Sequence, residues 1–169
     1  MGGGDVRDTF FIEFRIPDSG FRIRLFSKLL WWIHQQDMFC GGYFEKMGYR
    51  SFFQLPVWRE SVDFAAEVYK FCDKGPLKSD YRMRDQLRAA ATSISSNIAE
   101  GFEFKNNKEF VRFLFYAKGS TSEVFTQFCI LFRAGIVNKD DYRYFCKKAF
   151  TLGNKIGGLI QYLKQVKNP

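Results

Sequence analysis

Residues 86–101 read QLRAAATSISSNIAEG, and their apolar positions decide the fold of the chain. Together with one residue just before them, these positions recur every three or four residues: Met83, Leu87, Ala90, Ile94 and Ile98. This spacing places the side chains on one face of an α-helix. The stretch therefore predicts a long amphipathic helix, which Gly101 is expected to end.

Three further stretches of the chain show the same helical spacing of apolar residues. They cover residues 55–72, 106–135 and 138–166, and the breaks between them are short. Four amphipathic helices with short connections pack as antiparallel neighbours. The sequence therefore predicts an all-α, antiparallel up-down four-helix bundle over residues 51–169.

Polar side chains that can cap a helix precede three of the four predicted helices. Glu109 follows one of them by three residues, which is the spacing of a capping box. Gly135 is expected to end the third helix. The candidate caps are Ser79 or Asp80 for the second helix, Asn106 for the third, and Asn138 or Asp140 for the fourth.

Residues 1–50 do not continue this pattern and are predicted to form a separate N-terminal extension. Apolar residues alternate over 9–16 and 21–25, and turn-forming residues lie between them at 17–20, which favours a β-hairpin. Two alternatives stay open. The extension is disordered, or it is an upstream region translated ahead of a true start at Met47.

The positive charge of the chain lies entirely in the predicted bundle. The formal net charge is +8, and residues 1–46 carry six basic and six acidic side chains, which cancel. A basic module of this size indicates a polyanionic partner such as nucleic acid, although a merely cationic surface is the competing interpretation. The candidate nucleic-acid-binding residues are Arg84, Lys105, Lys108, Arg112, Arg143, Lys147, Lys148, Lys155 and Lys164.

The residue types needed for catalysis or metal binding are missing from the predicted bundle. His34 is the one histidine of the chain and lies in the extension, so a nucleophile–histidine pair is not expected. The four cysteines are widely spaced, which disfavours zinc or a redox pair. We therefore expect no enzyme, no cofactor and no metal. The longest apolar run, residues 29–33, is too short to span a membrane.

Five polar residues lie beside the apolar stripes of the second and third helices and are predicted to form a structural hydrogen-bond network. A charged bond from Arg88 to Glu123 or Glu100 would fix the relative register of the two helices. The competing interpretation is that Asn97 and Glu100 line a ligand pocket. The predicted network comprises Arg88, Asn97, Glu100, Ser120 and Glu123.

The third predicted helix carries a second, weaker apolar stripe. A helix that is apolar on more than one face needs more than one neighbour, and a homo-oligomer would supply it. Cover by the N-terminal extension is the alternative. The candidate oligomer-interface residues are Phe115, Phe125, Cys129 and Phe132.

Residues 86–101 resemble the signature of the bacterial 23S rRNA intervening-sequence protein family, a family of four-helix bundles. The resemblance extends over about residues 52–167 and does not cover residues 1–46. Further matching residues are Leu55, Trp58, Phe110, Phe113, Leu114, Ala117, Gly119, Ser120, Glu123 and Gln127. The resemblance implies a bundle that assembles into a ring-like homopentamer.

The family is also similar to the accessory variability determinant proteins of diversity-generating retroelements, which partner a reverse transcriptase and bind nucleic acid. We therefore expect a cytoplasmic, non-enzymatic oligomer that binds structured RNA or DNA through phosphates. The alternative function is a protein-interaction scaffold, for example an accessory subunit of a reverse transcriptase. A nucleic-acid enzyme is the least favoured alternative.

Overall fold

The computed structural model describes residues 11–15, 22–26 and 48–165. The chain separates into two compact units, Met1–Gly42 and Tyr43–Pro169. In the first unit, strands β1 (Phe11–Arg15) and β2 (Arg22–Phe26) pair antiparallel, with Phe11 opposite Phe26. The alternating pattern predicts two such strands, whereas the predicted turn at 17–20 and Met47 lie outside the described residues.

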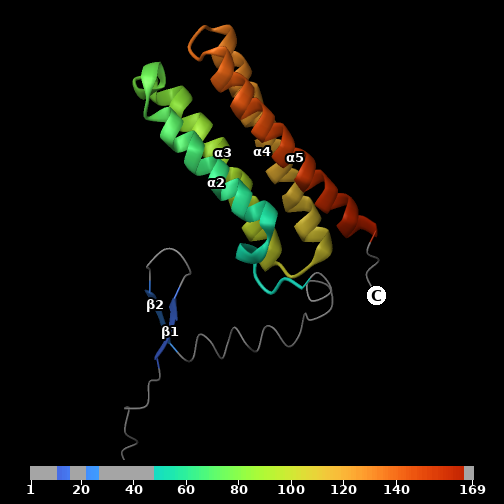
Figure 1. Ribbon diagram of the computed structural model, residues 1–169. Coiled ribbons are helices and arrows are strands. Elements are labelled where there is room, and N and C mark those ends of the chain that lie inside the picture. The colour runs from blue at the N-terminus through green and yellow to red at the C-terminus, as the bar shows by residue number, and fades with distance from the viewer. Residues whose placement is uncertain (1–10, 16–21, 27–47, 166–169) are drawn as a thin grey trace, which may run out of the picture. The chain divides into compact units, whose positions relative to one another are not determined.

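The second unit is an all-α bundle, as predicted. Its four helices run alternately up and down, and each packs beside the next in sequence (Figure 1). Of the four neighbouring pairs, α2 and α5 have the least extensive contact. The elements are η1 (Phe52–Gln54), α2 (Pro56–Cys72), η2 (Gly75–Lys78), α3 (Tyr81–Glu103), α4 (Asn107–Arg133) and α5 (Lys139–Gln165).

Side-chain caps fix where three of these helices begin. The Asp80 carboxylate accepts from the backbone N–H of Met83 at 3.1 Å, so Asp80 rather than Ser79 caps α3. Asn106 caps α4 as predicted, accepting from the N–H groups of Lys108 and Glu109. Asn138, and not Asp140, caps α5. These bonds satisfy amide groups that have no partner inside the helix.

The two glycines predicted to end helices behave differently. Gly135 follows the last turn of α4 with φ of +71°, and the next N–H returns to the Leu131 carbonyl at 2.9 Å. This is a Schellman ending that favours glycine. The prediction for Gly101 is wrong, because α3 continues through it to Glu103 and the left-handed residue after α3 is Lys105.

Gly101 serves helix packing instead. A Cβ placed there would lie 2.5 Å from the Cβ of Phe113 on α4 and 3.1 Å from the Phe110 ring. The absence of a side chain therefore lets α3 and α4 approach closely at the turn that joins them. An apolar stripe read from sequence does not distinguish a packing glycine from a terminating one.

An aromatic cluster joins three of the helices. The Phe128 ring of α4 stacks on the Phe145 ring of α5 with centroids 4.5 Å apart. Phe71 of α2 contacts both rings at 5.6 and 4.8 Å. Such ring pairs add to the stabilisation that burial already supplies. The cluster therefore sets the rotation of α5 about its own axis.

The bundle contains no membrane-spanning candidate. Within residues 48–165, every helix is too short or too polar to cross a bilayer.

We predict that Gly101→Ala destabilises the bundle by about 1–2 kcal/mol, because the new methyl group overpacks the α3–α4 contact. Gly119→Ala is the matched control, since a Cβ at Gly119 on α4 meets nothing within 4 Å. That control should instead gain up to about 1 kcal/mol from helix propensity. Denaturant unfolding of both variants measures the difference, and equal stabilities would contradict the packing role.

Candidate nucleic-acid interface

Charge is divided unequally between the two halves of the bundle. Helices α4 and α5 together carry ten basic and four acidic side chains, whereas α2 and α3 carry five basic and six acidic ones. The excess of positive charge within the helices therefore belongs to the α4–α5 half. A polyanion approaching the bundle meets its strongest attraction there.

Two of the α5 lysines form ion pairs with carboxylates of α2. Lys148 donates to both carboxylate oxygens of Glu67 on α2 at 2.6 and 2.7 Å, and Lys155 pairs with Glu60 at 2.6 Å. Burial acts to lower the pKa of Lys148, but the bond to Glu67 outweighs it and the pKa is raised. Lys148 and Lys155, both predicted to bind nucleic acid, thus connect α5 to α2.

Most other cations of α4 and α5 are exposed and form no ion pair within residues 48–165. Arg143 and Lys147 are exposed and form no ion pair among residues 48–165. The Lys164 ammonium lies 4.8 Å from the ring centre of Phe115 on α4. We define the cationic face by six residues of α4 and α5: Lys118, Arg133, Lys139, Arg143, Lys147 and Lys164.

Three members of the cationic face were not predicted from sequence: Lys118, Arg133 and Lys139. Candidates were chosen where cations cluster along the chain, whereas Lys118 has no other cation within four residues on either side. The fold brings it to α5, since a Cβ at Gly157 would lie 3.5 Å from Lys118 Nζ. Lys139 lies one helical turn before Arg143, and this spacing could have found it. Lys118 and Arg133 have no such neighbour in their helix, so only the packing of α4 on α5 reveals them.

The remaining predicted cations lie elsewhere. Arg84 pairs with Asp85 at 3.2 Å near the start of α3. At the opposite end of the bundle (Figure 1), Lys105 and Lys108 lie at the turn between α3 and α4. Arg112 pairs there with Glu109, the residue expected to complete the capping box, at 2.6 Å. The structure therefore does not gather the nine candidates into one site.

The predicted polar network is only partly brought together. Asn97 donates to the carbonyl and hydroxyl of Ser93 at 2.7 and 3.0 Å, and Ser120 donates to the same hydroxyl at 3.1 Å. This links α3 to α4. Glu100 is exposed, and Glu123 accepts from Gln127 of its own helix at 3.5 Å.

The predicted partner of Arg88 is wrong. Its guanidinium pairs with Asp73 at 2.6 Å, just after α2, and not with Glu123 or Glu100. It also donates to the Tyr69 carbonyl at 3.5 Å. Arg88 therefore lies on the side of α3 that packs against α2, where it holds the end of α2 rather than the register of α4.

The second apolar stripe of α4 packs against α5 of the same chain. Phe125 and Cys129 are half-buried, Cys129 lies 3.8 Å from the Tyr142 hydroxyl, and Phe132 stacks on Tyr142 of α5. Phe115 lies beneath Lys164. The extra neighbour that the stripe requires is thus α5, while contact with another copy stays a prediction.

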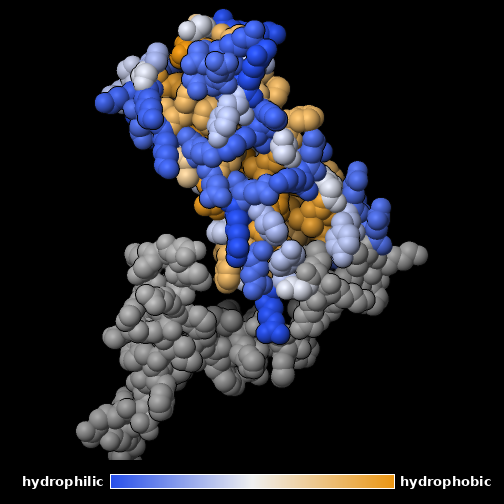
Figure 2. All heavy atoms as spheres, in the orientation of Figure 1, coloured by the Kyte–Doolittle hydropathy of each residue, from blue (hydrophilic) through white to orange (hydrophobic). Residues whose placement is uncertain are grey.

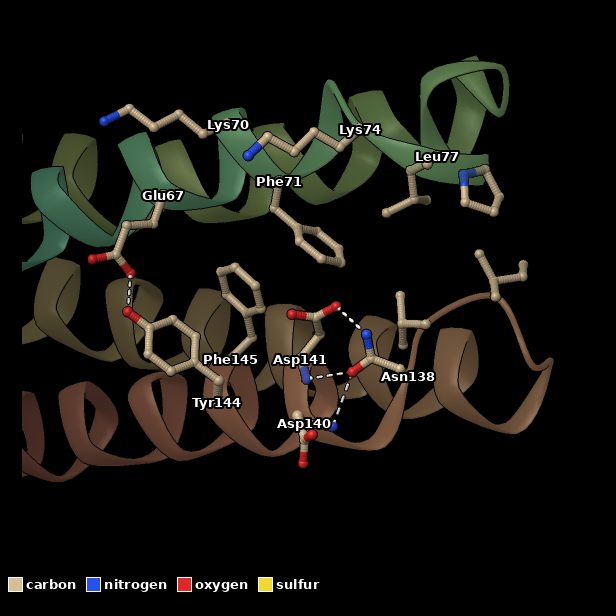
Figure 3. Close-up of a pocket in the computed structure, with 14 residues that line it drawn as sticks. Glu67, Lys70, Phe71, Lys74, Leu77, Asn138, Asp140, Asp141, Tyr144 and Phe145 are labelled. Carbon is tan, nitrogen blue, oxygen red and sulfur yellow. Dashed lines mark hydrogen bonds between the residues drawn. The ribbon is translucent and has the colours of Figure 1, made fainter.

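A groove of about 760 Å³ lies between α2 and α5, the neighbouring pair with the least extensive contact (Figure 3). Phe71, Leu77 and Phe145 line it, and an apolar strip between polar rims marks this side of the bundle (Figure 2). Its walls carry Lys70 and Lys74 as well as Asp140 and Asp141. Because both signs of charge are present, the groove attracts phosphate less than a purely cationic surface does.

No group of three or more histidine, cysteine, aspartate or glutamate side chains in the described part of the chain is placed to hold a metal ion.

Comparison with known proteins agrees with the bundle. The model of the family described as 23S rRNA-intervening sequence protein matches residues 54–158. A crystal structure of a protein of unknown function from the S23 ribosomal protein family, from Bacteroides thetaiotaomicron VPI-5482, is similar, with a TM-score of 0.56 and 21% identity. The similarity covers 62% of this chain and 97% of that one and shows a shared fold. No curated protein matches.

We predict that Cys146, where α5 packs on α4, resists alkylation in the folded protein. Burial, reinforced by the adjacent Cys129, raises the pKa of the Cys146 thiol to about 12. Below that pH the thiol keeps its proton, and only the thiolate reacts. Peptide mapping after iodoacetamide treatment at mildly alkaline pH should show Cys146 modified only in unfolded protein. Equal modification of folded protein would contradict the packing of α5 on α4.

Proposed function

The chain belongs to the 23S rRNA-intervening sequence protein family, and we propose that it binds nucleic acid, structured RNA above all, through phosphate contacts on the cationic face. The observation that carries the proposal is the unequal division of charge between the α4–α5 half and the α2–α3 half. Exposed cations that form no ion pair within residues 48–165 are available to phosphates.

Phosphate contact requires cations and little else. Each lysine or arginine that neutralises a phosphate releases counterions, which supplies affinity independent of base sequence. On the cationic face, Arg143 and Lys147 are one helical turn apart, so they can reach adjacent phosphates. Such a pair attracts phosphate more strongly than Lys148 and Lys155 do, because Glu67 and Glu60 already compensate the charge of those two lysines.

The proposed role is binding without catalysis and without a cofactor. General acid–base or nucleophilic chemistry requires a titratable group matched to its task and placed beside its partner. The bundle has no histidine, and the carboxylates of Glu60 and Glu67 form ion pairs with lysines. We place the protein in the cytoplasm, where thiols such as Cys72 and Cys146 remain reduced.

A protein-interaction scaffold, for example an accessory subunit of a reverse transcriptase, is the second candidate function. The α2–α5 groove favours it, because Phe71, Leu77 and Phe145 offer apolar area between charged walls. Binding through this groove would depend on apolar burial and respond weakly to salt. A salt titration of RNA binding by the isolated protein therefore separates the two candidates.

We further propose that the protein is a homo-oligomer, a pentamer by analogy with its family. Phe115 and Phe132 remain 48% and 37% exposed at the α4–α5 contact, which leaves apolar area for another copy. Light scattering at micromolar concentration should return a multiple of the 19.9 kDa chain mass, and the mass of a single chain would refute the oligomer.

We predict that replacing two outward cations, Arg143→Gln with Lys147→Gln, weakens RNA binding. The slope of the logarithm of affinity against the logarithm of salt concentration should fall by about 1.5, because two phosphate contacts are lost. The charge-matched control, Lys148→Gln with Lys155→Gln, removes the same formal charge from the α2 side of α5 and should leave the slope nearly unchanged.

Two outcomes would contradict this proposal. Equal losses in both double variants would mean that binding follows net charge and not the cationic face. Binding by the unmodified protein that stays constant between low and moderate salt would exclude phosphate contacts altogether. Circular dichroism checks that both variants stay folded, since exposed ion pairs contribute only about 0–1 kcal/mol each.

A further inference from the structure

An exposed stripe of residues runs along the outer side of α5. Its members are spaced by three or four residues and therefore lie on the same side of the helix. All of them are exposed, and none is acidic. We call them the α5 stripe: Arg143, Lys147, Phe150, Asn154, Gly158 and Gln161. Two of these residues belong to the cationic face.

Phe150 is unusual among the exposed aromatic residues of the bundle. Its ring is 64% exposed, and no ring or cation contacts it in the described part of the chain. Apart from Tyr162, each of the other exposed aromatic residues has a ring or a cation against it. Phe150 thus presents an unoccupied aromatic surface to solvent.

Along α5, the residues next to Phe150 do not form an apolar patch. One turn before it lies Lys147 and one turn after it lies Asn154, while Cys146 on the same helix is buried. A contact between protein copies is built around contiguous apolar area and is depleted of lysine at its centre. A lone ring between a lysine and an amide has another use, because nucleobases stack on aromatic rings beside phosphate-binding cations.

We propose that Phe150 is a stacking platform for an unpaired nucleobase, so that the α5 stripe takes a single-stranded segment of RNA. The proposal rests on the proposed function and refines its ligand. Arg143 and Lys147 neutralise phosphates on one side of the stacked base. On the other side, the Asn154 amide has both a donor and an acceptor to offer a base edge.

The same geometry disfavours a continuous duplex. In a double helix the faces of the bases are covered by their neighbours, so a phenylalanine on a straight helix surface finds no base to stack on. Loops, bulges and ends of a structured RNA supply such bases. The cations of the stripe serve both kinds of RNA, whereas the Phe150 ring serves only the unpaired one.

The test compares two probes with the full-length chain: a short unstructured oligouridylate and an RNA duplex of equal length. Phe150→Ala should weaken binding of the single strand by roughly ten- to a hundredfold and leave duplex binding unchanged. Phe150→Tyr keeps an aromatic ring and should retain binding. Phe150→Leu keeps apolar volume without a ring and should behave like the alanine variant.

Each other outcome overturns the inference. Unchanged single-strand binding by Phe150→Ala, or equal losses on both probes, would show that the ring does not stack on a base. Full binding by Phe150→Leu would indicate a merely apolar contact, and a smaller oligomer in light scattering would place Phe150 between protein copies. If salt-dependent binding persists while Phe150→Ala has no effect, only this inference fails. If the unmodified protein binds neither probe, the proposed function fails with it.

Discussion

The stacking of Phe128 on Phe145 governs which side of α5 faces the rest of the bundle. With Phe145 turned inward against α4 and Phe71 of α2 packed on both rings, α5 has one rotation about its axis that buries its apolar face. Lys148, three residues after Phe145, then lies beside α2, where it forms an ion pair with Glu67. Lys147 and Phe150 remain exposed, although Lys147 also lines a second pocket beside Glu60, Asp63 and Glu67 of α2. The aromatic core therefore decides which cations are neutralised and which are presented.

The surface charge of the bundle follows from which cations form ion pairs and which do not. Cations that face α2 are paired with carboxylates and contribute to holding α2 and α5 together, whereas those on the outer side of α4 and α5 have no acidic partner among residues 48–165. A polyanion that approaches this side therefore meets positive charge that no ion pair within residues 48–165 compensates. The comparisons show the 23S rRNA-intervening sequence protein family and a shared bundle fold, whereas the proposed RNA contact rests on the charge itself.

The bundle could be predicted from sequence because each helix carries its own stripe and most carry their own caps, such as Asn106 and Asn138. Features that depend on contact with a neighbouring helix could not be predicted from sequence. Gly101 looked like a terminator because Phe113 lies twelve residues away, and Arg88 was assigned to α4 although its partner follows α2. The position of each candidate cation in the bundle could not be predicted for the same reason. Spacing along one helix shows which cations are adjacent. It does not show whether a carboxylate on the facing helix forms an ion pair with them.

Ultraviolet cross-linking of the full chain to a structured RNA, followed by peptide mapping, tests most directly whether the α4–α5 half is the RNA-binding surface. We expect cross-links within α4 and α5, from Lys118 through Asn154, and their loss as salt is raised. Cross-links concentrated on α2 and α3, or on the groove wall at Lys70 and Lys74, would contradict it.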